Sequence, residues 1–155
     1  LTTGSIAAMS TDQVVALTSN QAATLSTAQV AALSTNDVAA METADFAALK
    51  TASIAAMSTG QTGALTTDQI VALTTAQAGA LTSAQVVGMS TNAVAALETA
   101  DLAQIKTAAI AALGTAQIAA LTTNETASLS TAQIAALTTN QIANGLTTDQ
   151  VVSLS

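Results

Sequence analysis

An aliphatic residue followed by a hydroxyl pair returns every eight residues along this chain, and that period is the strongest constraint on its fold. The aliphatic residues that set the phase run from Leu1 to Leu137, and continue at Leu146 and Leu154 after one inserted residue. A fixed short period is typical of solenoids and fibrous arrays, in which each unit packs on its neighbours. The sequence therefore predicts a single repeat array over residues 1–155.

The eight positions of the octad differ in how strictly they are kept. Positions one to eight hold an aliphatic residue, Ser or Thr, Thr, a variable residue, Gln or Asp, Ile or Val, Ala or Val, and Ala. Position three is Thr or Ser from Thr3 through Thr148. Position two also admits charged residues and glycine: Glu42, Lys50, Glu98, Lys106 and Gly114. A hydroxyl is thus required at position three and preferred at position two.

A helix N-cap in every octad best explains these hydroxyls. Thr or Ser at position three would accept a hydrogen bond from a backbone N–H two or three residues on, with Gln or an acid in the first turn of the helix. Alternatively, position two is the cap. Gln at position five then completes a capping box, and Leu with Ile or Val forms a hydrophobic staple. Both interpretations begin a helix at the same place within one residue.

Such a helix cannot continue through the next octad. Eight residues at about 100° each would rotate the apolar stripe by roughly 80° per repeat, so a continuous helix would bury none of its Leu and Ile well. We therefore predict an all-α solenoid of short helices of about one and a half turns, with one break per octad at the Ser/Thr pair. Leu, Ile or Val and the Ala pair are expected inside.

Two irregularities refine this prediction. The octad near the C-terminus contains one extra residue at Asn144-Gly145, where the short helix should end, and Gly past a helix end commonly adopts the left-handed conformation. A longer repeat of 56 residues, about 10–65 and 66–121, makes residues 34–51 return as residues 90–107. Duplication of a seven-octad block explains this repeat and the equivalent places of the two lysines.

A β-solenoid with sixteen residues per coil is the alternative fold. Thr, Ile and Val favour strands, and in period the chain resembles the octad repeats of bacterial ice-nucleation proteins. Such coils turn on residues that tolerate positive φ, whereas the corners here would hold Ala and the chain has only seven Gly. Ala is also the best helix former. The helical solenoid is therefore favoured.

The composition excludes most site chemistry. The chain has no His, Cys, Tyr, Trp or Pro, and its two basic residues leave a formal net charge of −7. This charge opposes binding to nucleic-acid phosphates and to anionic membrane surfaces, which need basic clusters. No apolar run reaches the roughly 18 residues of a membrane-spanning helix. We therefore expect no cofactor, no nucleic-acid partner and no membrane insertion.

Few residues could do chemistry. Ser53 lies three residues after Lys50 and could form a Ser–Lys dyad, but hydroxyls occur at equivalent positions throughout and are better explained as caps. The residues that set the octad phase include the four Met, and Phe46 matches Leu102 in the second block, so these are expected in the core. The sequence therefore predicts no catalytic residue and no enzyme.

Acids spaced three apart could instead provide oxygen ligands for Ca²⁺. Glu42 pairs with Asp45, and Glu98 with Asp101, on one predicted helix face. An exposed charged pair balanced by the following lysine is the preferred interpretation. The remaining acids look like first-turn residues of helices: Asp12, Asp37, Asp68, Glu125 and Asp149. We therefore predict no metal site.

Position four alternates among Asn, Ala, Asp and Gly, and is expected to face outward.

One resemblance covers the whole chain. Octads such as residues 25–33, LSTAQVAAL, and residues 129–137, LSTAQIAAL, resemble the Ala/Thr-rich repeats inside very large proteobacterial surface proteins labelled adhesin- or haemagglutinin-like. The resemblance implies an extracellular or cell-surface scaffold and transfers no functional residue.

The functions that fit these observations are structural or adhesive. The first is a repeat rod, stalk or filament segment, which extends by association end to end or by continuation of the repeat in a longer chain. The alternative is a binding solenoid that presents its Ser/Thr rows to a repetitive surface such as polysaccharide or ice. Because the chain opens on Leu1 rather than Met, it is expected to be a mature product or a piece of a longer tract.

Overall fold

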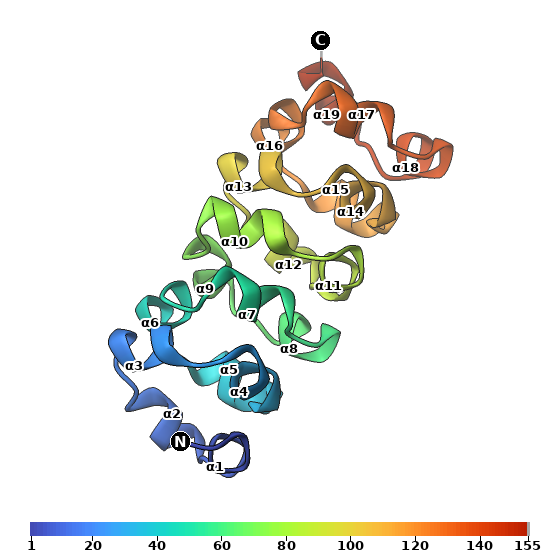
Figure 1. Cartoon of the computed structure of the whole chain (residues 1–155). Coiled ribbons are helices and arrows are strands. Elements are labelled where there is room, and N and C mark those ends of the chain that lie inside the picture. The colour runs from blue at the N-terminus through green and yellow to red at the C-terminus, as the bar shows by residue number, and fades with distance from the viewer. Residues whose placement is uncertain (155) are drawn as a thin grey trace.

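The computed structural model describes residues 1–154 and consists of short α-helices wound into a solenoid (Figure 1). This part of the chain contains nineteen helices of four to six residues and no strand. The helices are α1 Thr3–Ala7, α2 Thr11–Val15, α3 Ser19–Thr24, α4 Thr27–Ala32, α5 Thr35–Ala40, α6 Thr43–Ala47, α7 Thr51–Ala55, α8 Thr59–Gly63, α9 Thr67–Val71, α10 Thr75–Ala80, α11 Ser83–Gly88, α12 Thr91–Val94, α13 Thr99–Gln104, α14 Thr107–Ala112, α15 Thr115–Ala120, α16 Thr123–Ser128, α17 Thr131–Ala135, α18 Thr139–Asn144 and α19 Thr148–Ser153. The predicted all-α octad solenoid is confirmed, and the β-solenoid alternative is wrong.

Three consecutive helices make one coil of the solenoid. Each helix packs against the helix three further along the chain, as α1 does with α4, α2 with α5 and α3 with α6, and this pattern continues to α16 with α19. Helices that stack in this way form three columns. The coils lie one above another in a rod, with the two ends of the chain at its opposite ends (Figure 1).

Two extended residues turn the chain from one helix to the next. At the end of α4, Leu33 has φ −63° and ψ 142°, and Ser34 at the start of α5 has φ −70° and ψ 164°. No described residue has a positive φ. The octad therefore changes direction without using glycine or proline, which is why Ala and Thr suffice at its corners.

The N-cap is the residue at octad position two, one residue earlier than the preferred sequence interpretation placed it. In α9, the Thr66 side-chain oxygen accepts from the backbone N–H of Gln69 at 3.2 Å, and the Gln69 side-chain oxygen accepts from the backbone N–H of Thr66 at 3.1 Å. This is the capping box of the alternative interpretation. Position three is the first helical residue, and its side chain is exposed or half-buried.

Some octads lack this side-chain cap. Glu42, Lys50, Glu98 and Lys106 occupy the N-cap place of α6, α7, α13 and α14 without forming a cap hydrogen bond. Gly114 at the start of α15 has no side chain, although its backbone N–H donates to the Gln117 side-chain oxygen at 2.9 Å. The octads whose position two is not Ser or Thr therefore lose the side-chain hydrogen bond that caps the helix N-terminus.

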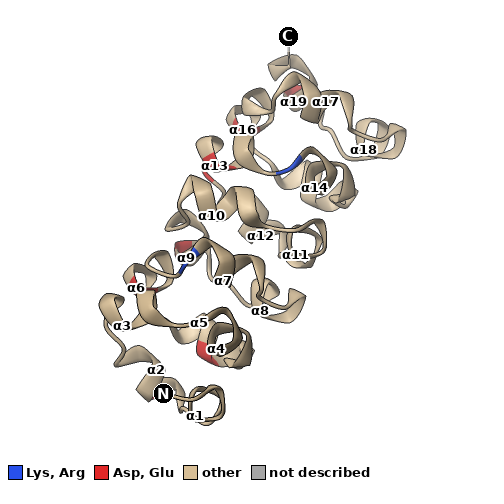
Figure 2. Ribbon diagram, viewed as in Figure 1, with Lys and Arg blue, Asp and Glu red and all other residues tan. Residues whose placement is uncertain are grey.

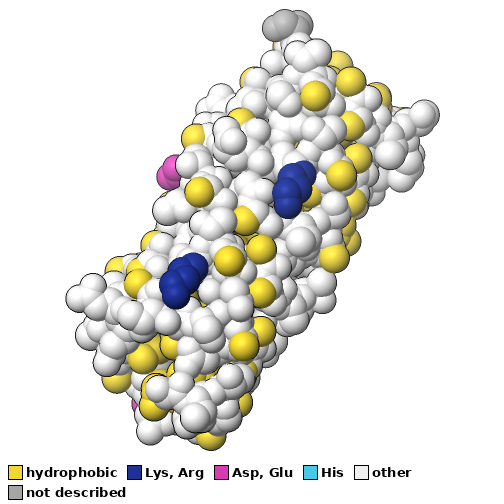
Figure 3. All heavy atoms as spheres, in the orientation of Figure 1, with side chains coloured by type: hydrophobic (Ala, Val, Ile, Leu, Met, Phe, Trp, Pro, Cys, Tyr) yellow, Lys and Arg dark blue, Asp and Glu magenta, His cyan; other side chains and the backbone are white. Residues whose placement is uncertain are grey.

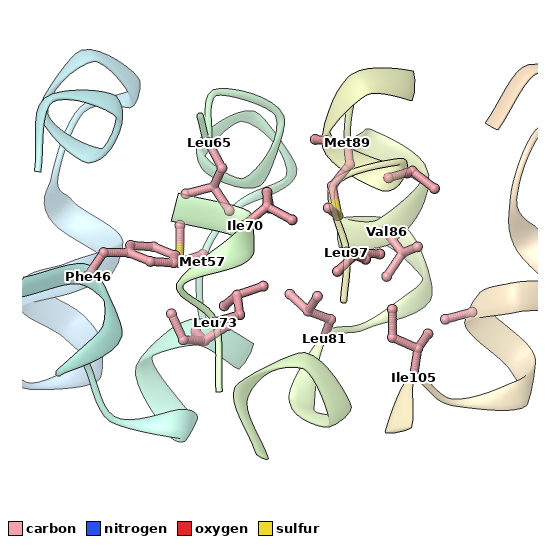
Figure 4. Packing of buried hydrophobic residues seen from close by; sticks show 14 of the residues in the cluster. Phe46, Met57, Leu65, Ile70, Leu73, Leu81, Val86, Met89, Leu97 and Ile105 are labelled. Carbon is pink, nitrogen blue, oxygen red and sulfur yellow. The ribbon is translucent and has the colours of Figure 1, made fainter. Parts of the chain in front are cut away.

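The core is formed by octad positions one and six. Residues of both kinds from successive coils point toward one another along a continuous axis (Figure 4). Ile70 and Phe46 are fully buried, and Leu65 is 6% exposed. The expectation that the Ala pair also lies inside is wrong, because positions seven and eight are half-buried or exposed, as at Ala55 and Ala56. Instead of the Ala pair, the Gln side chains at position five lie buried in most coils.

Glycine at position seven of α8 lets two neighbouring coils approach closely. A Cβ added to Gly63 in α8 would lie 2.8 Å from the carbonyl oxygen of Gly88 in α11.

The inserted Gly145 ends α18 as predicted, but with φ −105° rather than in the left-handed conformation. A Cβ there would lie 2.5 Å from the Gln141 carbonyl oxygen and 3.1 Å from a methyl of Ile118. Close contact, rather than φ, explains this glycine.

The position of the cap predicts which hydroxyl of a pair stabilises the fold. Replacing Thr66 by Ala removes the acceptor for the Gln69 N–H and should lower the free energy of unfolding by about 1 kcal/mol. Replacing the adjacent, exposed Thr67 should cost clearly less. Urea unfolding followed by circular dichroism measures both variants. A larger loss from Thr67→Ala would place the cap at position three instead.

Candidate functional site

Position five of the octad carries the most connected side chain in the molecule. In α9, the Gln69 amide nitrogen donates to the carbonyl oxygens of Val38 at 2.7 Å and Met41 at 2.8 Å. Val38 lies in α5, and Met41 directly follows that helix. Because the Gln69 side-chain oxygen already caps its own helix, this one buried amide joins the start of one helix to the end of a helix in the preceding coil.

The same bond pattern recurs through most of the rod. Each of these glutamines donates to two carbonyl groups about 28 and 31 residues earlier, at distances of 2.6 to 3.1 Å. Besides Gln69, the residues are Gln61, Gln77, Gln85, Gln117, Gln133, Gln141 and Gln150, and all are buried. We call them the inter-coil glutamines.

Hydrogen bonds between coils come from side chains alone. Within residues 1–154, every backbone-to-backbone hydrogen bond is local in sequence, as in the pairs Met9–Ile6 and Leu73–Ile70. A helix of five or six residues cannot satisfy the last carbonyls of its own backbone. The inter-coil glutamines provide donors for those carbonyls and at the same time hold the coils in register.

Sequence reasoning missed this role, although a signal for it was present. A capping box needs only an acceptor at its third helical residue, and Glu provides one as well as Gln. The chain nevertheless uses Gln at this place in most octads and Glu only at Glu125. A preference for the amide over the carboxylate indicates that its second, donating group also has a partner.

Among helices α5 to α19, seven octads have a residue other than Gln at position five. They are Asp37, Asp45, Ser53, Ala93, Asp101, Ala109 and Glu125, and each of them is buried. Asp37 keeps the local half of the Gln interaction, since its carboxylate accepts from the Ser34 N–H at 3.1 Å and the Ser34 hydroxyl at 2.6 Å. None of the seven has an amide nitrogen to donate to the coil before it.

The two acid pairs considered for Ca²⁺ are each split by burial. Glu42 and Glu98 are exposed, whereas Asp45 and Asp101 are buried, so the expected exposed charged pairs are wrong for the aspartates. Asp45 accepts a hydrogen bond from the Ser19 hydroxyl at 2.7 Å. In the described part of the chain, no three acidic, His or Cys side chains lie close enough together to hold a metal ion.

Asp101 is the least satisfied carboxylate. Its Oδ2 is buried and has no hydrogen-bond partner. Burial, and to a lesser extent the Glu98 carboxylate, raise the pKa of Asp101 above its ordinary value of 3.8. Loss of water around a charged carboxylate without a compensating donor is the physical cause.

The structure does not form the Ser–Lys dyad. Ser53 is fully buried and its hydroxyl has no hydrogen-bond partner, whereas Lys50 is exposed at the start of α7. A base that could activate a hydroxyl must lie within hydrogen-bond reach of it. Ser53 stands at the place of an inter-coil glutamine, so the position itself, rather than Lys50, explains its burial.

The remaining sequence interpretations concern the surface. Asp12, Asp68 and Asp149 lie exposed in the first turns of their helices, and Asp37 and Glu125 lie there buried. Every position-four residue is exposed, as expected. Charged residues are sparse along the ribbon (Figure 2), and the two lysines are well separated on the face that Figure 3 shows.

Comparison with known proteins identifies the repeat. The ALTTAQ repeat family matches residues 1–27, 38–75, 94–131 and 127–155. No curated protein and no solved structure matches the chain. Among the described helices, none is both long and apolar enough to cross a membrane.

The inter-coil role of glutamine predicts opposite effects for two isosteric changes. Replacing Gln69 by Glu keeps the capping acceptor but turns an oxygen toward two carbonyl oxygens, and should lower stability by about 1–3 kcal/mol. Gln13 in α2 has the same capping box without a preceding coil, so Gln13→Glu is the matched control and should have little effect. Glu125→Gln should raise stability. Equal losses from both Gln changes, measured by urea unfolding, would contradict an inter-coil contribution.

The raised pKa of Asp101 predicts a pH-dependent contribution to stability. The folded protein holds the Asp101 proton more tightly than the unfolded chain does. The penalty of the buried carboxylate is therefore full above the raised pKa, and it disappears as the pH falls through that pKa toward 3.8. Asp101→Asn should be more stable than the parent near pH 7, with a difference that shrinks on acidification. Exposed Asp68→Asn is the control, and a difference for Asp101→Asn that stays constant with pH would contradict the assignment.

Proposed function

We propose, starting from the fact that the chain belongs to the ALTTAQ repeat family, that it forms a rod, stalk or filament segment of a bacterial cell-surface or extracellular protein. The observation that carries this proposal is the repeated inter-coil glutamine. It recurs between Gln61 in α8 and Gln150 in α19, and wherever it occurs it joins neighbouring coils by the same bonds. A chain organised in this way builds length rather than a single site.

The arrangement of polar groups supports a spacer rather than an enzyme. The buried glutamines at position five form their hydrogen bonds with backbone groups, as Gln69 does, and the charged residues are spread thinly along the rod. A catalytic hydroxyl needs a positioned base, and Ser53 has no such partner. We therefore propose that the chain has no hydrolytic or transfer activity.

The first coil supports extension of the rod. Gln13 and Gln21 make the bonds of their own capping boxes, and among the described residues neither donates to another coil. Next to Gln21 lies a cavity of about 290 Å³, lined also by Leu1, Leu17, Thr24, Leu25 and Gln29. A further coil of the same repeat fits this surface, because its helix ends carry the carbonyl groups that these amides bind elsewhere. A longer polypeptide or a second copy of the chain could provide that coil.

The extracellular part of the proposal rests on the resemblance of the octads to repeats of large bacterial surface proteins. The composition is compatible with it, since a chain without Cys has no thiol to oxidise outside the cell. The net negative charge, spread along the sides of the rod, also keeps neighbouring rods from adhering side by side.

One observation favours a second function, the binding of a repetitive surface such as polysaccharide or ice. The position-three hydroxyls recur at every helix start and face solvent or lie half-buried. Within the described chain, Ser19 is the only one of them with a hydrogen-bond partner. These rows of free hydroxyls would be available to a partner with a matching repeat.

The rod proposal predicts concentration-dependent growth of the isolated chain. Sedimentation and electron microscopy should detect rods that lengthen end to end, because each end has the surface of a coil interface. Gln13→Ala with Gln21→Ala should weaken this association at least about tenfold, since each removes donors worth about 1 kcal/mol. Thr27→Ala with Thr51→Ala, at exposed position-three sites, is the matched control. A compact particle that stays monomeric, or any turnover abolished by changing Lys50 or Glu42, would overturn the structural role.

A further inference from the structure

Between α5 and α19, six of the seven octads without an inter-coil glutamine form two groups of three, and Glu125 in α16 stands alone. Three of them are consecutive in α5, α6 and α7, where position five is Asp37, Asp45 and Ser53. Three more are consecutive in α12, α13 and α14, where it is Ala93, Asp101 and Ala109. Since three helices make one coil, each group is one whole coil. We call α5–α6–α7 and α12–α13–α14 the glutamine-free coils.

The coil α12–α13–α14 is held to the coil before it by packing alone. By the spacing of 28 and 31 residues, glutamines in its three helices would bind the carbonyls of Leu65, Leu73 and Leu81 and of the residues three before them. Within the described residues, no side-chain hydrogen bond joins this coil to α9, α10 or α11. In α5–α6–α7, the Ser19–Asp45 hydrogen bond is the only described one to the preceding coil.

Other features weaken the same coils. Glu98 and Lys106 begin α13 and α14 without a side-chain cap, as Glu42 and Lys50 do in α6 and α7. Asp101 and Ser53 contribute the buried polar atoms that lack a partner. In a stack where stability comes from interfaces between neighbours, the interface with the fewest bonds opens first.

From this placement we infer that the glutamine-free coils are axial joints, at which the rod separates or extends while the glutamine-bonded coils between them stay closed. The two joints lie 56 residues apart, once in each duplicated block. A rod of this kind yields stepwise under axial load instead of failing at an arbitrary point. Helices as short as these lose their structure when the coil that supports them detaches.

Hydrogen exchange of the unaltered protein, followed by mass spectrometry, tests the central joint. Backbone amides of residues 91–112 should exchange at least about tenfold faster than those of the bonded coil at residues 59–80. They should also exchange faster than amides of residues 115–135, although that segment lies nearer one end. Equal protection in 91–112 and 59–80, or protection that falls steadily toward the ends, would overturn the inference.

Variants separate an inter-coil effect from local helix fraying. Ala93→Gln with Asp101→Gln and Ala109→Gln should slow exchange in residues 91–112 at least about tenfold, because it adds the missing donors. Glu98→Ser with Lys106→Ser restores side-chain caps without adding inter-coil bonds. Residues 91–112 of this variant should still exchange faster than residues 59–80. If the cap variant alone abolishes the difference in exchange rate between residues 91–112 and 59–80, the inference of an axial joint is wrong.

Removing inter-coil glutamines tests the same inference even if the glutamines added at residues 93, 101 and 109 do not fit. Gln61→Ala with Gln69→Ala and Gln77→Ala removes the donors of α8, α9 and α10, and should create a new fast-exchanging coil at residues 59–80. Unchanged exchange in that variant would show that the glutamines do not control axial opening.

Discussion

Everything in this solenoid depends on satisfying the carbonyl groups at the ends of very short helices. A helix leaves its last four carbonyls without an i+4 partner, and in helices of four to six residues short turns satisfy only some of them: Val38 accepts from the Met41 N–H, whereas the Met41 carbonyl has no backbone donor among the described residues. Buried carbonyls without donors would make such a fold unstable. The buried glutamine resolves this by using both ends of one amide, its oxygen for the N-terminus of its own helix and its nitrogen for the C-terminus of another. Capping and stacking are therefore one interaction.

The period and the apolar positions were sufficient to predict the architecture. A helical stripe cannot survive an eight-residue repeat, so a break per octad follows from geometry, and Leu and Ile identify the core. The cap was misplaced because uniformity was taken as evidence of hydrogen bonding. Position three is uniform, yet Thr67 is exposed, whereas the variable position two holds the cap at Thr66. An extended backbone at position two accommodates Lys50 or Gly114 as well, which explains its variety.

The inter-coil contacts could not be predicted because they depend on how many octads complete a coil. A glutamine such as Gln69 meets residues 28 and 31 positions earlier only when three helices make one coil. Nothing in the octad itself fixes that number. The aspartates were misjudged for the same reason, since Asp45 and Asp101 lie buried only because another coil covers them.

The duplicated block and the coil do not share a common length. A block is seven octads and a coil is three, so a block contains two coils and one helix more. Each new block therefore starts one column further round, and the pattern returns to its first column only after three blocks. A residue that occurs once per block, such as the lysine at Lys50 and Lys106, cannot form a straight line along the rod. Any partner that recognises blocks rather than octads would have to follow a spiral path around the fibre, while one that recognises octads could bind along a single column.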